Sequence, residues 1–374
     1  MNKVAPKVCI QIVTWNSQQF LKDCLDSIFN QTYKNFSILV IDNGSKDETI
    51  KFIKENYFPK HGSMEIYKEF RQNKPDLFII QNKKNVGFSK AHNQGLAISQ
   101  ADFVLVMNPD VILEPDFLEK LIEAAEKDDK ISSLGGKILK LKWGDAEIGE
   151  KLKTNILDST GLKILRSGQV IDRGEGETDN GQHDNQEEVF GISGACVLYR
   201  RAALEDIKIP VIRNSYIGNK FVIRSRAIRQ PAESDEYFDE DFFAYKEDID
   251  LAWRLQLFGW QSVYVPTAKA YHFRSGAPAS LRFSQSRWVN FLSFRNHLWL
   301  FVKNMHWQIF WRNFWFILWH QSLKKLYLLF TQPGILLKGK LSFLQKFSKM
   351  LAKRKYILSQ SKLNWRVINK WMNR

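Results

Sequence analysis

The sequence has few cysteines, no long apolar run and no acidic residue in its last third. Only three of its 374 residues are cysteine, and Cys9, Cys24 and Cys196 form neither a CxxC pair nor a cluster with histidine. We therefore expect neither a disulfide scaffold nor a structural zinc site. We expect a protein of a reducing compartment. The N-terminus lacks the apolar stretch of a secretory signal peptide, which predicts a cytoplasmic chain.

Length and composition are those of an ordinary globular protein. Hydrophobic residues make up 44% of the chain and charged residues 25%. These fractions exclude a disordered, a collagenous and a multi-spanning membrane protein. Within residues 287–330, which are dense in Trp, Phe and Leu, the longest uncharged stretch, residues 313–323, has 11 residues. A helix needs about 20 apolar residues to cross a bilayer, so this stretch is too short.

The position of the acidic residues divides the chain in two. Residues 1–250 hold 34 Lys and Arg against all 40 Asp and Glu, whereas residues 251–374 hold 21 Lys and Arg. Eight of the twelve tryptophans also lie beyond residue 280. We therefore expect a mixed-charge domain over residues 1–280 and a basic, Trp-rich helical extension over residues 281–374.

Tryptophans of the extension mark one face of a helix, because Trp311, Trp315 and Trp319 recur every four positions. Aromatic residues on one face with Lys and Arg on the other are typical of a helix lying on an anionic membrane surface. The alternative is that these helices pack on the first domain and leave a solvated basic face. We favour the membrane surface, because acidic residues are wholly absent. No RNA- or DNA-binding module is recognisable, so nucleic acid is not expected as a partner.

The first hundred residues alternate strand and helix signals. Each short apolar run is followed by a segment whose apolar residues have helical spacing. Such βαβ units build a parallel sheet, which binds its ligand at the carboxyl ends of the strands. Strands are expected at residues 8–14, 36–41, 77–80 and 103–107, and the loops after them at 14–16, 42–47, 85–87 and 108–110.

Beyond residue 140 the pattern is looser. Residues 173–188 are polar and glycine-rich, which predicts a mobile loop, and residues 214–234 predict a second flexible loop. Between them, residues 190–200 predict a strand that Gly191 and Gly194 interrupt.

Two aspartates stand at predicted strand ends. Asp42, followed by Gly44 and Ser45, could accept a hydrogen bond from a nucleobase or ribose; alternatively it forms an Asx-turn that caps the next helix. Asp110 follows Pro109, which makes it a candidate ligand for a divalent cation that also binds diphosphate oxygens. A simple turn explains Asp110 equally well.

A second group of acids opens a predicted helix. Glu247, Asp248 and Asp250 lie within four residues, although a helix start needs only one acid for its dipole. Carboxylates crowded together raise one another's pKa, which suits a general base. Further on, His272 is either a buried core histidine or a metal ligand facing Asp110.

Seven of these motifs occur in a fixed order, and the ordered set is specific although each motif alone is weak. They are VCIQIVTWN at 8–16, IDNGSKD at 41–47, NVGFSKAHNQG at 85–95, NPD at 108–110, Gly194-Ala195, EDIDLAWR at 247–254 and His272. Together they resemble family 2 glycosyltransferases of the GT-A fold, nearest to the rhamnosyltransferase-like branch, over residues 7–305. The resemblance implies an α/β fold with a Rossmann-like, mostly parallel sheet flanked by helices, followed here by the basic helical extension.

The resemblance also implies a role for each matching position. Asp248 would be the catalytic base, while Asp110 and His272 would hold Mg²⁺ or Mn²⁺. Asn108 stands where the family's DxD motif has its first acid, as is common in this branch. Donor binding would involve Thr14, Asn16, Asp42, Gly44, Ser45, Asn85, Gly87, Lys90, Asn93, Asn108 and Asp110, and the acceptor or donor sugar would contact Gly194, Ala195, Glu247, Asp250 and Arg254.

The implied activity is inverting, metal-assisted transfer of a sugar, with rhamnose the leading guess, from a nucleotide sugar to a lipid-linked or polysaccharide acceptor of the cell envelope. The expected location is the inner face of the cell membrane, bound peripherally. One alternative is a retaining or nucleotidyl-transferring enzyme on a similar sheet. The other is a catalytically inactive scaffold or binding protein on the membrane surface. The oligomeric state is left open.

Overall fold

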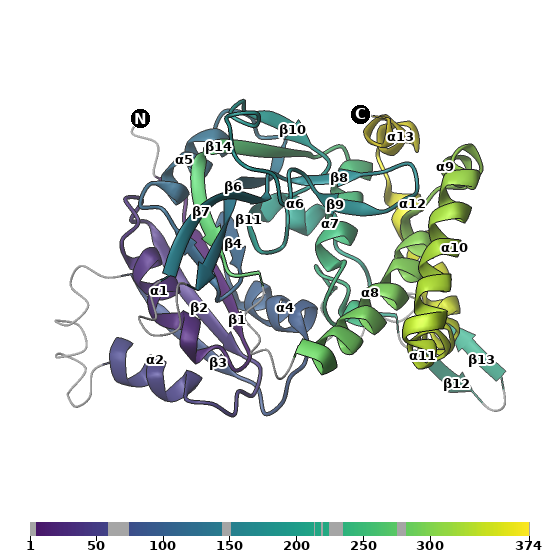
Figure 1. The fold of residues 1–374 in the computed structure, drawn as a ribbon, viewed down its shortest axis with the longest axis horizontal. Coiled ribbons are helices and arrows are strands. Elements are labelled where there is room, and N and C mark those ends of the chain that lie inside the picture. Colours follow the sequence, from purple (N-terminus) through teal and green to yellow (C-terminus); the bar gives the residue numbers. More distant parts are fainter. Residues whose placement is uncertain are drawn as a thin grey trace. The chain divides into compact units, whose positions relative to one another are not determined.

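The computed structural model describes residues 5–58, 75–143, 151–212, 214–217, 220–223, 235–274 and 282–373. The chain forms two compact units, which we describe separately (Figure 1). Unit 1 comprises Met1–Leu162, Asp172–Leu204 and Gln261–Gly276, and unit 2 comprises Lys163–Ile171, Glu205–Trp260 and Ala277–Arg374.

Unit 1 is built on one mixed sheet in which four neighbouring strands are parallel. Along the sheet the strands follow the order β10-β14-β6-β11-β4-β1-β2-β3, and β5 and β7 pair with β14 and β6. The strands are β1 (Val8–Thr14), β2 (Phe36–Asp42), β3 (Leu77–Gln81), β4 (Phe103–Met107), β5 (Val111–Leu113), β6 (Ile131–Trp143), β7 (Lys151–Ser159), β10 (Glu187–Val189), β11 (Cys196–Arg200) and β14 (Gln261–His272).

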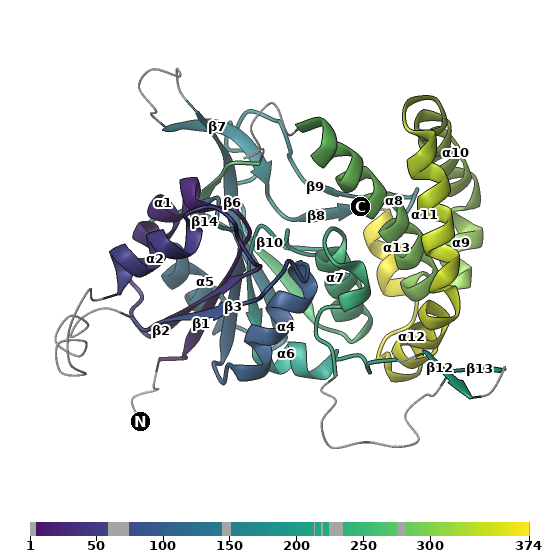
Figure 2. The same ribbon diagram turned by 90° about the horizontal axis from the view of Figure 1, so that it is seen from below.

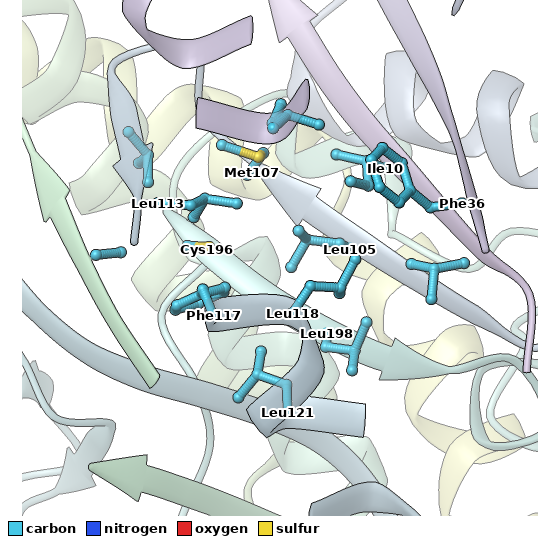
Figure 3. Close-up of a cluster of buried hydrophobic side chains, with 14 of the residues drawn as sticks. Ile10, Phe36, Leu105, Met107, Leu113, Phe117, Leu118, Leu121, Cys196 and Leu198 are labelled. Carbon is cyan, nitrogen blue, oxygen red and sulfur yellow. The ribbon is translucent and has the colours of Figure 1, made fainter. Parts of the chain in front are cut away.

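Helices cover both faces of this sheet. Alternate residues of a strand point to opposite faces. Ile10 of β1 therefore joins the apolar core under α1 (Gln18–Phe29) and α5 (Phe117–Ala125), whereas Gln11 faces α4 (Phe88–Ile98) (Figures 2 and 3). Gly95 permits this close packing of α4, because a Cβ there would lie 2.8 Å from the Gln11 side chain. The helices of the first half are α1 (Gln18–Phe29), α2 (Thr49–Tyr57), α4 (Phe88–Ile98) and α5 (Phe117–Ala125).

The parallel βαβ pattern expected at the N-terminus is confirmed. Strands β1, β2, β3 and β4 begin and end within one residue of the predicted bounds. Strand β1 pairs in parallel with both β2 and β4, and β2 pairs in parallel with β3. The loops after all four strands therefore lie at the same edge of the sheet. This edge is where the sequence placed the candidate binding loops.

The predicted mobile loop at residues 173–188 is instead folded. It forms tight turns, and Lys137 of β6 forms ion pairs with Asp179 (2.8 Å) and Asp184 (2.5 Å). The segment ends in β10, which pairs with β14. The strand predicted at residues 190–200 is shorter than expected, because β11 begins only at Cys196. Glycine and polar composition indicated a turn-rich segment, but not the buried lysine that fixes it.

Unit 2 is mainly helical. Its helices are η1 (Glu240–Phe242), α7 (Glu247–Leu257), α8 (Arg282–Asn304), α9 (Trp307–Arg312), α10 (Phe314–Thr331), α11 (Pro333–Gln345), α12 (Phe347–Gln360) and α13 (Arg366–Met372). The flexible loop predicted at residues 214–234 contains a hairpin of β12 (Asn214–Ile217) and β13 (Lys220–Ile223), and its remainder lies outside the described residues. Helix α6 (Arg201–Asp206) and the pair of β8 (Leu162–Ile164) with β9 (Val170–Asp172) complete the elements.

The two compact units do not coincide with the domains predicted at residues 1–280 and 281–374. The segment Glu205–Trp260, which carries the predicted base, groups with the C-terminal helices. The assignment of residues 281–374 as a separate membrane-associating region therefore stays a prediction. Of the helices that the structure describes, none combines the length and apolarity needed to cross a membrane.

Candidate functional site

Asp42 ends β2, and its carboxylate organises the turn that follows. One oxygen accepts hydrogen bonds from the hydroxyls of Thr14 (3.0 Å) and Ser45 (2.5 Å). The other accepts from the backbone N–H groups of Gly44 and Ser45, both at 3.1 Å. Gly44 has φ +72°, and a Cβ there would lie 2.9 Å from the backbone of Lys84, so only glycine fits. Asp42 thus forms an Asx-turn, but this turn does not cap the next helix, because α2 begins at Thr49 after an N-cap at Glu48. Contact of Asp42 with a nucleotide stays a prediction.

The loop after β1 is tied to the same turn. Asn16 has a left-handed backbone (φ 52°), its amide oxygen accepts from the Lys46 N–H at 2.8 Å, and its own N–H donates to the Ser45 hydroxyl at 2.8 Å. These bonds fix the edge position of Thr14, Asn16, Asp42, Gly44 and Ser45, the first five residues predicted for donor binding.

The third predicted loop, residues 85–87, is hydrogen-bonded to the turn after β2 by an asparagine side chain. The side chain of Asn43 donates to the Gly87 carbonyl at 3.2 Å, and Asn85 accepts from the Gly87 N–H at 2.9 Å. Gly87 has φ 90° and is the N-cap of α4. This helix carries Lys90 with an exposed side chain and Asn93 with a half-buried one. A helix N-terminus beside polar loops favours a bound anion such as a phosphate.

The fourth loop brings Asn108 beside the predicted sugar loop. The Asn108 N–H donates to the Ala195 carbonyl at 2.8 Å, because β4 pairs antiparallel with β11 from Met107 to Cys196. Gly194 and Ala195 therefore lie next to Asn108, as expected of residues that share one donor site.

Asp110 and His272 meet across paired strands, as predicted. His272 lies opposite Val111 in the β5–β14 register, and its Nε2 is 3.4 Å from the Asp110 carboxylate. The Nδ1 of the same ring contacts Asp158 at 2.8 Å. Asp158 in turn pairs with Arg274 at 3.3 Å. The result is a chain of alternating acid and base at one end of β14.

Sequence reasoning missed Asp158, which lies 114 residues from His272. Burial alone would lower the pKa of His272, but the carboxylates of Asp110 and Asp158 raise it to about 10. Burial alone would raise the pKa of Asp158, but His272 and Arg274 bring it below its ordinary value. Asp158 therefore fixes the ring orientation, and no periodicity or motif marks such a partner in the sequence.

The Asp110–His272 pair fits a divalent cation that shares its coordination with phosphate. Across the described part of the chain, no group of three or more His, Cys, Asp or Glu side chains is arranged to hold a metal ion. A protein site for Mg²⁺ commonly supplies only one or two carboxylates and leaves the rest to substrate phosphates and water. A carboxylate with an imidazole, itself oriented by Asp158, is a donor set that also suits Mn²⁺ once the metal has displaced the proton that Asp110 and Asp158 favour on His272.

The predicted base lies in unit 2, at the start of α7. Asp248 is half-buried and accepts from the Ile249 N–H at 2.8 Å. Glu247 is buried, and its Oε2 has no hydrogen-bond partner among the described residues. Burial, reinforced by the charge of Asp248, raises the pKa of Glu247 to about 8. Glu247 is thus a neutral acid near pH 7, and Asp248 is the more accessible carboxyl group.

Glu247 gives a pH prediction. Its pKa in the folded protein is above the ordinary glutamate value, so its contribution to stability is full below about pH 4.5 and is lost as the pH rises towards 8. Glutamine mimics the protonated form. We expect Glu247→Gln to match the wild type at pH 5 and to exceed its free energy of unfolding by a few kcal/mol, about 1.4 kcal/mol per pKa unit, at pH 8.5. Denaturant titrations across this range test it, and parallel pH profiles would contradict it.

Asp250 and Arg254, predicted to contact the sugar, lie in the interior of unit 2. Both side chains are fully buried and form an ion pair at 2.9 Å. Arg254 also donates to the carbonyls of Ile207 and Tyr237, both at 2.6 Å. Because neither side chain is exposed, we replace the predicted sugar contact with a structural role: the pair joins α7 to the segments before it.

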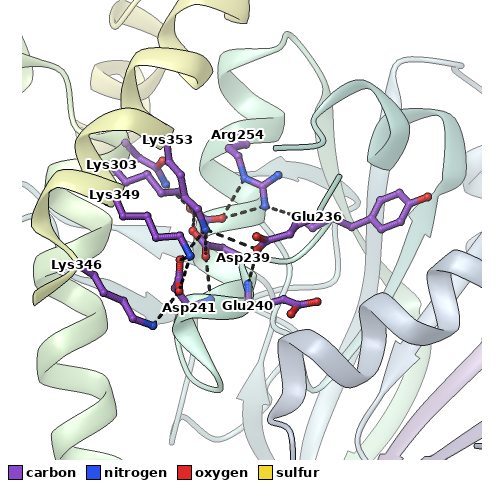
Figure 4. A network of polar contacts seen from close by, with 12 residues as sticks. Glu236, Asp239, Glu240, Asp241, Arg254, Lys303, Lys346, Lys349 and Lys353 are labelled. Carbon is purple, nitrogen blue, oxygen red and sulfur yellow. Dashed lines mark hydrogen bonds and ion pairs between the residues drawn. The ribbon is translucent and has the colours of Figure 1, made fainter. Parts of the chain in front are cut away.

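A larger set of buried ion pairs anchors the segment before α7 (Figure 4). Lys353 of α12 contacts Asp239 at 2.5 Å and Asp241 at 2.9 Å, and Lys303 of α8 contacts Asp239 at 2.6 Å and Asp250 at 2.7 Å. Burial alone would raise the pKa of Asp239, but the two lysines lower it to about 2. Several of the C-terminal lysines thus neutralise acids of this segment.

The backbone before Asp248 is held in a strained shape. Phe243, Tyr245 and Lys246 all have positive φ, between 67° and 76°, which costs about 1–3 kcal/mol per residue. The side-chain amide of Asn296 in α8 donates to the carbonyls of Phe242, Ala244 and Tyr245 at 2.7–2.9 Å. The extension therefore holds the loop that presents the predicted base. Its approach to the donor loops of unit 1 stays a prediction.

Comparisons with known proteins agree with these features. The family model of Glycosyl transferase family 2 matches residues 9–208, and that of Glycosyl transferase family group 2 matches residues 178–352. An uncharacterized glycosyltransferase of Haemophilus influenzae is 33% identical over 130 residues, which cover 35% of this chain and only 36% of that relative.

A longer match is to the N-acetylglucosaminyl-diphospho-decaprenol L-rhamnosyltransferase of Mycobacterium tuberculosis, 26% identical over 289 residues, 74% of this chain and 78% of the relative. Among solved structures, GalNAc-T7 with UDP, GalNAc and Mn²⁺ superposes with a TM-score of 0.51 at 11% identity, covering 80% of this chain and 48% of that one. This likeness supports the GT-A fold. With a family model matching more than half of its length, the chain belongs to glycosyl transferase family 2.

Proposed function

We propose that the protein transfers a sugar, with inversion, from a nucleotide sugar to a hydroxyl of a lipid-linked glycan acceptor. One observation supports this proposal: the Asp42 turn, Asn108 and the Asp110–His272 pair lie at one edge of the sheet. The chain that places them there belongs to glycosyl transferase family 2. Rhamnose and a diphospholipid acceptor are supported by the name of the mycobacterial relative.

We assign donor binding, metal binding and proton transfer to different residues of the site. The Asp42 turn, with Thr14 and Asn16, shapes the wall that receives the nucleobase and ribose. Asp110 and His272 would hold Mg²⁺ or Mn²⁺, which supplies positive charge to the departing diphosphate when bound. Asp248 takes the proton of the acceptor hydroxyl as it attacks the sugar carbon from the face opposite the nucleotide. Charge placed in advance at the leaving group supplies much of the rate enhancement.

Aromatic residues of α9 and α10 support a position at the inner face of the cell membrane. Trp311 of α9 and Trp315 and Trp319 of α10 expose 63–75% of their surface. The single helix face that the spacing predicted is divided, because α9 ends at Arg312 and α10 begins at Phe314. Exposed Arg312 and Lys325 flank them with positive charge. Such a surface suits peripheral binding to anionic lipid. In contrast, Lys303 and Lys353 form buried ion pairs and therefore do not contribute to the attraction between the protein and anionic lipid.

A donor screen with a metal-site variant tests the proposal. We expect dTDP-rhamnose with Mn²⁺ to raise the thermal midpoint more than other nucleotide sugars. Asp110→Asn is expected to weaken Mn²⁺-dependent donor binding by about tenfold or more, or about 1.4 kcal/mol, because it removes the carboxylate beside His272. Calorimetry with and without Mn²⁺ measures this loss separately from turnover.

Asp116→Asn is the matched control, since Asp116 lies outside the predicted sites and forms a partly exposed ion pair with Lys120. Equal Mn²⁺ dependence in the two variants would remove Asp110 from the metal site. The anomeric configuration of the product, read by NMR, tests inversion: a product with the donor's own configuration would exclude it. Absence of binding to any nucleotide sugar would favour the inactive scaffold.

A further inference from the structure

An arginine two residues after β14 connects the candidate metal site to a turn that supplies none of its predicted ligands. The guanidinium of Arg274 contacts Asp158 at 3.3 Å and also forms ion pairs with Asp172 and Glu175. Asp158 belongs to β7, whereas Asp172 ends β9 and Glu175 lies in the turn that follows. Arg274 therefore joins the carboxylate behind His272 to two acids that lie outside the predicted site.

The Asp158 carboxylate is in contact at both of its oxygens. One oxygen lies 2.8 Å from Nδ1 of His272, and the other lies 3.3 Å from the Arg274 guanidinium. Only 3% of the Asp158 side chain is exposed. Because the imidazole is held at Nδ1, its Nε2 is left to face Asp110, which lies 3.4 Å away. A carboxylate behind a ligating histidine fixes the orientation and the tautomer of the ring in this way.

A β-bulge places Asp158 at this position. Ile138 of β6 lies opposite Ser159 of β7, and the next residue of β6, Leu139, lies opposite Leu157. Asp158 is therefore an extra residue of β7. Bulges re-aim a side chain and disrupt the ladder locally, and they are over-represented beside active sites. Regular pairing would suit a strand that only completes the sheet, so the bulge favours a further role for Asp158.

Asp172 is arranged for its contact with Arg274 rather than for stability. Its side chain is 11% exposed, and one of its oxygens pairs with Arg274. The other oxygen, Oδ1, is buried and has no hydrogen-bond partner among the described residues. Because an unsatisfied buried oxygen lowers stability, a purely structural link would be better made without it. Together with Glu175, Asp172 holds the guanidinium in the orientation that contacts Asp158.

We propose that Asp158 and Arg274 are positioning residues of the metal site. Arg274 holds the Asp158 carboxylate, and Asp158 holds the imidazole of His272, so that Nε2 is kept towards Asp110 before a metal binds. The acids at 172 and 175 act on the site through Arg274, although they supply no ligand. The inference deepens the proposed function and rests on it for the metal itself.

Binding of Mn²⁺ alone to the full chain tests the role of Asp158. The EPR signal of free Mn²⁺ gives the affinity, and pulsed EPR detects the nitrogen coupling of a coordinated imidazole, so neither readout depends on activity. Asp158→Ala is expected to weaken Mn²⁺ binding by roughly 10–100-fold and to reduce the nitrogen coupling, because the ring is no longer held. Asp158→Asn keeps an oxygen that accepts from Nδ1–H, so its loss is expected to be smaller.

Arg274→Lys tests whether the arginine acts through Asp158. Lysine keeps the positive charge near the site but lacks the fork that contacts Asp158 and Asp172 at the same time. We expect this variant to weaken Mn²⁺ binding by about threefold or more when Asp158 is present, and to add no further loss to Asp158→Ala.

Arg200→Lys is the matched control. Arg200 also donates to carbonyls, those of Ala125 at 2.6 Å and Ile131 at 2.7 Å, but it lies at the end of β11 that is opposite Cys196 and the Asn108 loop. Its replacement is expected to lower the thermal midpoint and to leave Mn²⁺ affinity unchanged. A purely structural role of Arg274 would give this same result in Arg274→Lys.

The outcomes separate the parts of the proposal. Wild-type Mn²⁺ affinity in Asp158→Ala, or equal losses in Asp158→Ala and Asp158→Asn, would overturn the positioning of His272. An additive loss from Arg274→Lys in the Asp158→Ala background would overturn the action of Arg274 through Asp158. If Asp158→Ala does not fold, equal Mn²⁺ affinities of Arg274→Lys and Arg200→Lys would overturn the proposal. Failure of the wild type to bind Mn²⁺ would remove the metal site from the proposed function, and this inference with it.

Discussion

Replacing Asp248 by asparagine is expected to reduce sugar transfer by roughly 10²–10⁴-fold, the usual contribution of a general base. The amide cannot take the proton of the acceptor hydroxyl, and the half-buried position of Asp248 leaves room for an isosteric side chain without repacking. Donor binding should change little, because the predicted donor loops belong to unit 1. Initial rates and donor calorimetry on the same preparation measure both quantities.

Asp116→Asn is the matched control for this experiment. It makes the same change of side chain, and Asp116, whose ion pair is with Lys120, is not among the residues predicted to bind the donor or the acceptor. We therefore expect nearly wild-type turnover at pH 7 in this variant. If Asp248→Asn retained full activity while Glu247→Gln lost it, the two residues would exchange roles, and the base would be the buried glutamate.

Replacing Lys353 by methionine is expected to lower the free energy of unfolding by about 3–5 kcal/mol, the usual cost of removing one partner from a buried ion pair. Lys353 is fully buried between Asp239 and Asp241, with Glu236 at 3.6 Å, and its loss leaves these carboxylates short of a cation. For a unit of this size the thermal midpoint should fall by roughly 6–20 °C.

Lys355→Met controls for the loss of a lysine from the same helix, because Lys355 is exposed. Its midpoint should stay within about 2 °C of the wild type, as is usual for surface substitutions. Equal effects of the two replacements would show that the buried pairs add no stability. Adding Asp239→Asn to Lys353→Met should restore part of the loss, because the second change removes a charge that the first left uncompensated.

The first half of the fold could be predicted well, because its signals are local. Strand bounds follow from short apolar runs, and the turn after β2 follows from Asp42, Gly44 and Ser45, whose bonds span only two or three residues. Because parallel strands end at the same edge of a sheet, the loops after them could be placed together at that edge from the strand predictions alone.

The orientation of His272 and the buried ion pairs of unit 2 could not be predicted, because the residues that form them are far apart in the chain. Nothing near Asp158 marks it as the residue that orients His272. Composition predicted that the C-terminal lysines face a membrane, yet Lys303 and Lys353 pair with acids 64 and 114 residues upstream. One signal was available: within the chain, a basic segment without any acid of its own can find carboxylate partners only in other segments, and the acidic run at residues 235–250 is the last one before it.

The same separation has a consequence for synthesis on the ribosome. Asp239, Asp241 and Asp250 are translated well before Lys303, and Lys353 follows Asp239 by 114 residues. At about 5–20 residues per second, the acids wait roughly 6–23 s for their last cation. During most of this interval burial of the nascent segment is unfavourable, because the ion-pair partners of Asp241 among the described residues are Lys346, Lys349 and Lys353, and before they are made its carboxylate would lie dry and unpaired. The loop that carries the predicted base thus gains its buried ion pairs only after α12 has been made.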